Sequence, residues 1–324
     1  MIRAAALAAA ASLAAAIPGT AGADDDARAW IERMTRALAE ESYSGEFEVE
    51  SAGRFERLRI IHRVRDGHVE ERLTSLSAEG REVVRSGDEV IAYLPDQQLA
   101  IIEHRPERSG LLGRMPRFGP EVERWYEVVL EGRRAALNGR YAMQVAVRPR
   151  DGYRFGHRLW IDEGSGMPVK AELSGADGRP LERMRFTQLE LRDDIADAEL
   201  DPGLDRRRFR WVRQVAQPAV EAEGWSVPSP PPGFRLSASA IQDMVGTPVP
   251  VSHLVFSDGL ASVSLFIRAA APGEKLPIGA GRAGSASALS TVVDGYQVTA
   301  IGEVPSTTLE ALAKGLHRAP DDRR

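Results

Sequence analysis

The stretch HLVFSDGLASVSLFI, residues 253–267, indicates an antiparallel hairpin in the C-terminal part of the chain. Two apolar runs flank Asp258-Gly259, a dipeptide typical of two-residue hairpin turns because glycine adopts a positive φ without a Cβ clash. With these two residues at the tip, Ser257 is predicted to face Leu260, and His253 to face Ser264. A sheet-based domain is therefore expected at this end of the chain.

The two faces of this hairpin differ in character, since side chains alternate across a strand. The face predicted to be core collects Leu254, Phe256, Ala261, Val263, Leu265 and Ile267. The other face mixes polar and apolar groups, as a surface that meets a protein partner does. The contact residues expected on it are His253, Val255, Ser257, Leu260 and Ser262.

A secretory signal is predicted over residues 1–23. Arg3 precedes an apolar stretch, and Ala21-Gly22-Ala23 forms a small-residue cleavage site. The apolar stretch of about 14 residues is shorter than the roughly 20 that cross a bilayer. The chain has no cysteine, which excludes disulfides, thiolate metal sites and a lipid-modified N-terminal cysteine. An exported protein of this size without disulfides fits the bacterial periplasm.

The N-terminal half changes period after one amphipathic helix. Trp30, Met34, Ala37 and Leu38 fall on one helical stripe. After it, Leu58, Ile60, His62 and Val64 alternate with Arg57, Arg59, Ile61 and Arg63, which is the period of a strand. We interpret the arginines as the solvated outer face of an edge strand; an acidic partner or anionic headgroups is the alternative.

Two breaks divide the chain. Residues 105–120 are rich in proline and glycine and predict a mobile loop that carries Leu111 and Leu112, and residues 226–233, SVPSPPPG, predict a stiff linker. The expected organisation is a signal peptide (1–23), a first domain (24–212), a linker (213–232), a second domain (233–317) and a disordered tail (318–324). Short strands with little intervening helix indicate an α+β fold with antiparallel sheets.

The search for catalytic or metal chemistry gives no candidate. The string GAGRAG, residues 279–284, lacks the preceding strand and following helix of a dinucleotide-binding motif. His253 and Ser257 lie roughly 13 Å apart along one strand, too far to hydrogen-bond. His62 and His68 lack a third ligand. We predict no catalytic residue, cofactor or metal site.

The charge balance does not favour nucleic acid as a partner. Lysine and arginine total 42 against 47 acidic residues, a net charge of −5. Nucleic-acid binding requires a clustered basic surface, and this balance gives no support for one.

Five separate segments carry a resemblance that spans nearly the whole mature chain. They are YSGEFEVESAGRFERLRIIHR (43–63), EERLTSLSAEGREVVRSGDEVIAYLPD (70–96), HRLWIDEGSGMPVKAELSGADGRPLERMRFTQLEL (157–191), HLVFSDGLASVSLFI (253–267) and DGYQVTAIGEVP (294–305). In this order they resemble the MucB/RseB family. The resemblance implies a periplasmic regulator that binds the periplasmic part of a membrane-spanning anti-sigma factor of the RseA/MucA type and shields it from regulated proteolysis.

The resemblance also implies a larger domain similar to LolA and LolB, a curved antiparallel sheet over helices with an apolar cavity, and a smaller C-terminal α+β domain that binds the anti-sigma factor. Lipid or lipopolysaccharide in the cavity is expected to release the partner, and lipoprotein is a further ligand that the resemblance allows. The cavity residues expected are Phe47, Val49, Leu58, Ile60, Val64, Leu111 and Leu112. The alternative is a lipoprotein or lipid carrier of the LolA type, and a homodimer is left open.

Overall fold

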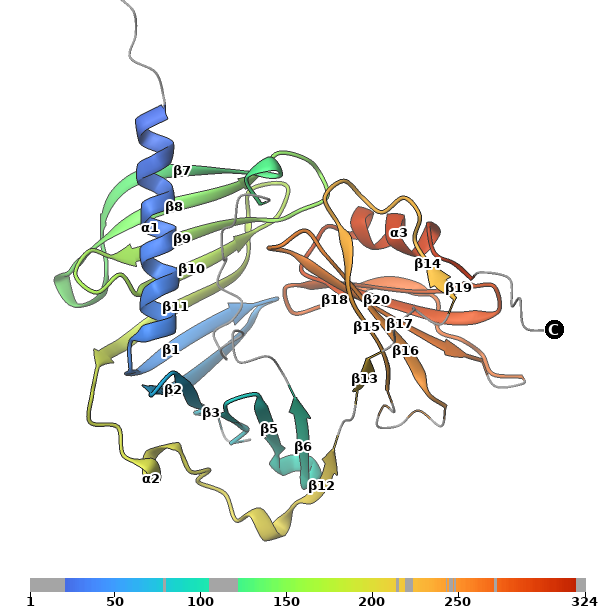
Figure 1. Cartoon of the computed structure of the whole chain (residues 1–324), viewed down its shortest axis with the longest axis horizontal. Coiled ribbons are helices and arrows are strands. Elements are labelled where there is room, and N and C mark those ends of the chain that lie inside the picture. Colours follow the sequence, from blue (N-terminus) through green and yellow to red (C-terminus); the bar gives the residue numbers. More distant parts are fainter. Residues whose placement is uncertain are drawn as a thin grey trace, which may run out of the picture.

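A computed structural model describes residues 21–77, 80–104, 122–213, 216–218, 224–242, 244, 247, 249–270 and 273–318. Two sheet domains lie side by side (Figure 1), one of 12 strands and one of seven. The α+β class with a larger and a smaller sheet domain is thereby confirmed. Residues 1–20 of the predicted signal and the whole predicted loop, residues 105–120, lie outside the described residues.

Helix α1 (Ala21–Glu40) lies across the large sheet and packs on β7 and β8 (Figure 1). Its side chains Ala27, Ile31 and Met34 face the sheet and are fully buried. The predicted helical stripe is confirmed, because Ala37 is also buried and Trp30 and Leu38 pack against the same apolar clusters. No described helix is long and apolar enough to cross a membrane.

The large sheet has the strand order β12-β6-β5-β4-β3-β2-β1-β11-β10-β9-β8-β7. Its strands are β1 (Tyr43–Ser51), β2 (Arg54–Arg65), β3 (His68–Ser75), β4 (Glu82–Ser86), β5 (Glu89–Leu94), β6 (Leu99–His104), β7 (Tyr126–Ala135), β8 (Tyr141–Pro149), β9 (Gly156–Asp162), β10 (Pro168–Ser174), β11 (Pro180–Leu191) and β12 (Arg210–Arg213). Pairing of β1 with β11 joins two meanders, and β12 adds in parallel to β6. Short helices connect them: η1 (Pro95–Gln97), η2 (Val122–Arg124), η3 (Leu137–Gly139), α2 (Asp197–Leu200) and η4 (Arg206–Arg208).

Strand β2 lies inside the sheet, between β1 and β3, so the prediction of an edge strand is wrong. Sequence alternation shows that one face of a strand is polar but does not show which strands flank it. Arg57 and Arg59 are exposed and paired with Glu46, whereas Arg63 is buried. Its guanidinium donates to Glu70 and, at 2.6 Å, to an oxygen of Asp197.

The smaller sheet has the order β13-β15-β16-β17-β20-β19-β18. Its strands are β13 (Ala216–Pro218), β15 (Arg235–Gln242), β16 (Val251–Ser257), β17 (Ser262–Ala269), β18 (Gly279–Ala283), β19 (Ala286–Val293) and β20 (Tyr296–Gly302). Helix α3 (Ser306–Lys314) covers one face, where Leu309 and Leu312 pack on Phe256 and Leu265 in one apolar core. The core face predicted for the hairpin is therefore confirmed.

The hairpin register differs from the prediction by two residues. Ser257 pairs with Ser262 and Phe256 with Val263, so residues 258–261 form a longer connection. Asp258 does not adopt the positive φ of a two-residue turn; its carboxylate instead accepts the backbone N–H groups of Leu260 (2.9 Å) and Ala261 (2.7 Å). Because the shift is even, each strand side chain keeps its predicted face.

The segment predicted as linker, residues 213–232, contains two short strands, and each pairs with a strand outside the segment. β13 adds to β15 of the small sheet, and β14 (Trp225–Ser226) pairs with β21 (His317–Arg318). Arg318 was assigned to a disordered tail, and this assignment is wrong: its guanidinium lies over the rings of Tyr296 and Trp225. Residues 319–324 lie outside the described residues.

Candidate functional site

The tip of the hairpin reaches out of its own domain and into the large one. The side chain of Asp258 is fully buried, and its Oδ2 accepts from Arg154 Nε at 2.5 Å and from the Tyr126 hydroxyl at 3.0 Å. Burial and the charge of Asp258 raise the pKa of Tyr126 far above its ordinary value, so the hydroxyl stays protonated and donates. One carboxylate thus joins the two domains.

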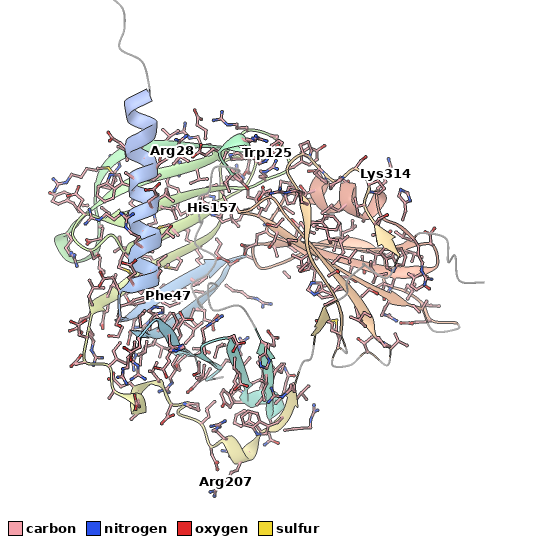
Figure 2. All side chains as sticks on the ribbon, viewed as in Figure 1. Arg28, Phe47, Trp125, His157, Arg207 and Lys314 are labelled. Carbon is pink, nitrogen blue, oxygen red and sulfur yellow. The ribbon has the colours of Figure 1, made fainter. Side chains whose placement is uncertain are left out.

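Arg154 is the centre of this junction. Its side chain is fully buried, and its guanidinium also donates to Asp151 and to the backbone oxygen of Pro232. The rings of Trp125 and Phe234 lie 4.8 and 5.0 Å from the guanidinium carbon. The two carboxylates, the hydrogen bonds and the faces of the two rings therefore compensate for the free energy that the Arg154 guanidinium loses when it is removed from water. Figure 2 labels Trp125 at the point where the two domains meet.

Leu260, next to the tip, packs against the apolar cluster under helix α1. That cluster contains Ile31 of the helix and Val122 of η2. Leu260 was predicted to face a partner, and the structure separates it from the other residues of that face. A side chain of the small domain thus contributes to the apolar core of the large one.

The rest of the predicted contact face lies on the side of the small sheet opposite α3. Val255 and Ser257 are half-buried and Ser262 is exposed. The imidazole of His253 stacks on Phe266, with centroids 4.4 Å apart, and its Nε2 lies 3.0 Å from Ser264 Oγ. Burial lowers the pKa of His253. Among the described residues, the hydrogen bond found for the His253 ring is this one to Ser264, and no carboxylate is bonded to the imidazole as the acid of a hydrolase triad is.

Four of the predicted cavity residues come together on the large sheet. Phe47 and Ile60 are buried, and Val49 and Leu58 pack against the same cluster. Figure 2 labels Phe47 on the side of the sheet near the C-terminal end of α1. The other members of this cluster are Ala37, Tyr43, Met167, Met184 and Phe186. Val64 is half-buried further along β2, and Leu111 and Leu112 lie outside the described residues.

A buried polar group continues this apolar row and was missed by sequence reasoning. His62 Nδ1 lies 2.9 Å from Glu71, whose other oxygen lies 3.2 Å from Arg85 Nε. All three side chains are almost fully buried, and Tyr43 stacks on His62. Burial raises the pKa of Tyr43. The position of His62 in an apolar stripe was a signal for a buried partner, but Glu71 and Arg85 come from other strands.

Comparison with known proteins identifies the family. Residues 26–204 match the MucB/RseB N-terminal domain and residues 219–317 match the MucB/RseB C-terminal domain. The chain belongs to the MucB/RseB family. Among curated relatives, the sigma factor AlgU regulatory protein MucB of Pseudomonas aeruginosa is 34% identical over 318 residues, covering 92% of each chain. The sigma-E factor regulatory protein RseB of Salmonella typhimurium is 25% identical over 91% of this chain and 92% of its own.

Solved MucB structures match over almost the same span. A crystal structure of MucB in complex with MucA(peri) has a TM-score of 0.71 and 31% identity, and covers 91% of this chain and 99% of that one. The complex structure of Pseudomonas aeruginosa MucA/MucB has a TM-score of 0.72 and 32% identity, with 91% and 99% coverage. MucB/RseB proteins are thus named as regulators, and MucB is seen with a partner.

The described residues contain no group of three or more histidine, cysteine, aspartate or glutamate side chains that could hold a metal ion. The family is one of regulatory proteins and is not a known enzyme family. The candidate surfaces are the face of the small sheet opposite α3 and the apolar side of the large sheet, with the hairpin tip between the two domains.

Proposed function

We propose that this chain binds the periplasmic part of a membrane-spanning anti-sigma factor and thereby regulates an envelope-stress sigma factor from the periplasm. The match along both domains to a relative solved with MucA(peri) supports this proposal. Bound protein would cover the anti-sigma segment and shield it from regulated proteolysis.

The contact surface proposed is the face of the small sheet opposite α3. It carries His253, Val255, Ser257 and Ser262, half-buried or exposed on two central strands. Val255 supplies apolar contact area, and the histidine and serine side chains beside it can hydrogen-bond to a partner. This mixture suits a surface that faces water when the partner is absent and is covered when the partner is bound. Leu260 would act on this surface indirectly, through the position of the hairpin.

We further propose that lipid or lipopolysaccharide occupies the apolar side of the large sheet and releases the partner. A ligand shifts such an equilibrium only by its difference in affinity for the two states. Leu260 gives a physical route, because it belongs to the apolar cluster under α1 and to the hairpin that carries the contact surface. An amphiphile that enters this cluster would compete with Leu260 and displace the hairpin.

The binding half is tested by calorimetry with the purified mature chain and the anti-sigma periplasmic segment. Val255→Asp is expected to weaken binding at least tenfold, about 1.4 kcal/mol, with little loss of thermal stability. Leu76→Asp is the control, an exposed leucine of the large domain that lies off the small sheet. Phe256→Asp should unfold the small domain because it buries an unpaired charge. Equal weakening by Val255→Asp and Leu76→Asp would contradict the assigned surface.

The lipid half is tested by repeating the titration with lipopolysaccharide fragments present. Weaker binding of the anti-sigma segment is expected. An unchanged affinity, together with tight binding of an acylated lipoprotein peptide, would instead support the lipid-carrier alternative.

A further inference from the structure

Residues 205–213, DRRRFRWVR, carry an exposed cluster of positive charge that the proposed function does not use. Five of these nine residues are arginine: Arg206, Arg207, Arg208, Arg210 and Arg213. The first three form η4, the last two lie on β12, and all five side chains are exposed. Asp205 is the one acid of the segment, and its carboxylate accepts the backbone N–H of Arg207.

Several arginines elsewhere on the large sheet are neutralised by carboxylates. Glu131 pairs with Arg148 and Arg158, and Glu48 pairs with Arg185. Within residues 205–213, the ion pair found among the described residues is a long one, 3.7 Å between Arg213 and Glu89, and both side chains are largely exposed. Carboxylates of the described residues therefore leave most of the positive charge of this segment unneutralised.

Aromatic contacts fix the segment to the sheet and leave one ring partly open. Phe209 and Trp211 meet the buried ring of Tyr93 edge-on, at 5.3 and 5.8 Å. The Trp211 indole donates to the backbone oxygen of Arg206, whose guanidinium lies 5.2 Å from the ring. Trp211 nevertheless remains 38% exposed. An amphipathic ring held among cations is typical of a surface at the headgroup level of a membrane.

The segment also projects from the molecule. β12 is the edge strand of the large sheet and pairs with β6 alone. Figure 2 labels Arg207 at the opposite end of the molecule from Lys314 of α3. A flat anionic surface could reach these arginines without contacting the small domain.

We infer that residues 205–213 dock on an anionic phospholipid surface. Guanidinium groups donate two parallel hydrogen bonds to phosphate oxygens, and Trp211 enters the interfacial layer. The chain as a whole carries a charge of −5, so attraction to such a surface requires a local cluster. Docking would set the orientation of the protein on the membrane, and this inference stands without the proposed partner.

Vesicle co-sedimentation of the mature chain tests the inference, with phosphatidylcholine vesicles compared against vesicles that also contain phosphatidylglycerol. The wild type should partition onto the anionic vesicles and not onto the neutral ones, and this should fade with added salt. The triple variant Arg207→Gln, Arg208→Gln, Arg210→Gln should lose roughly a hundredfold, because each arginine near the surface contributes about a factor of five. The corresponding lysine triple should retain most of the binding.

The matched control is Arg54→Gln, Arg134→Gln, Arg179→Gln, which removes the same charge from exposed positions elsewhere on the large domain. It should bind anionic vesicles like the wild type. Equal losses in the two glutamine triples would overturn the inference, as would equal wild-type binding to both kinds of vesicle. It would also be overturned if the glutamine triple kept vesicle binding but lost affinity for the anti-sigma segment, which would make these residues a protein-docking surface.

Discussion

Asp258→Asn removes the charge that joins the two domains, and its effect can be worked out from the contacts. The carboxylate accepts four groups: Arg154 Nε, the Tyr126 hydroxyl and the backbone N–H groups of Leu260 and Ala261. An asparagine keeps one oxygen for the two backbone groups, but its NH₂ then faces the Arg154 N–H, donor against donor. Arg154 stays fully buried, with Asp151 as its remaining carboxylate.

Loss of one partner of a buried ion pair costs about 3–5 kcal/mol. We expect about 3 kcal/mol for Asp258→Asn, since Asp151 still compensates part of the charge. The assay is urea unfolding of wild type, Asp258→Asn, Arg154→Met and the double variant. In the double variant the donor conflict is gone, so the two costs should fall short of additivity by about 2 kcal/mol. Asp177→Asn, in an exposed turn, is the control.

A cost below about 1 kcal/mol for Asp258→Asn would refute this reasoning, because a fully desolvated charge cannot lose its partner so cheaply. Additive costs in the cycle would refute it as well, since they would mean that Arg154 and Asp258 do not interact. A separate unfolding transition in the single variant is compatible with the reasoning, because it reports two domains that have come apart.

Two further predictions concern the same junction. Gly233→Ala should destabilise the protein at least twice as much as Gly295→Ala, which we expect to cost about 1 kcal/mol of unfolding free energy. The two glycines have similar φ angles, +83° and +81°, but only at Gly233 would a Cβ lie 2.4 Å from the Trp125 ring. Equal costs would contradict this prediction, because they would show that the Trp125 ring moves away freely. Burial lowers the pKa of His157 from 6.5 to about 4, against the opposing charges of Glu303 and Asp258. The unfolded chain therefore takes up this proton first, and stability that is complete above pH 6.5 is lost as the pH falls toward 4. His157→Gln should flatten this acid limb by at most about 3 kcal/mol, and an unchanged unfolding profile between these pH values would contradict the assignment.

Local patterns predicted the elements and their faces. Alternation placed Phe256 and Leu265 in the core, and helical spacing placed Met34 beneath α1, because both depend on the geometry of one element. The hairpin register could not be predicted from alternation alone. The Asp258 carboxylate caps the backbone N–H groups of Leu260 and Ala261, and this arrangement competes with a two-residue turn. Asp258 and Gly259 form a turn in either case, and the sequence alone does not show that Arg154 will hold the aspartate.

Long-range contacts account for what the sequence did not show. Arg63 appeared as one of a row of solvated arginines, yet it is buried and donates to Asp197, 134 residues away. Leu260 appeared to be a surface residue because the local pattern shows only the hairpin. The residues that cover it belong to the large domain, far away in the sequence. The cluster at residues 205–213 is visible in the sequence as five arginines with two aromatics. That the described part of the chain supplies it with only one long ion pair, from Glu89 to Arg213, emerges only from the fold.

The pairing of β1 with β11 has a kinetic consequence. Tyr43 lies opposite Leu191, almost 150 residues later in the chain. During synthesis, one edge of β1 therefore stays unpaired until β11 has been made. Closing so long a loop is entropically costly and slows folding. Until β11 arrives, the nine residues of β1 expose unpaired backbone donors and acceptors, a template for association between nascent chains. Fragments that end before residue 180 should therefore aggregate, and the intact chain should benefit from a chaperone that shields this edge during synthesis.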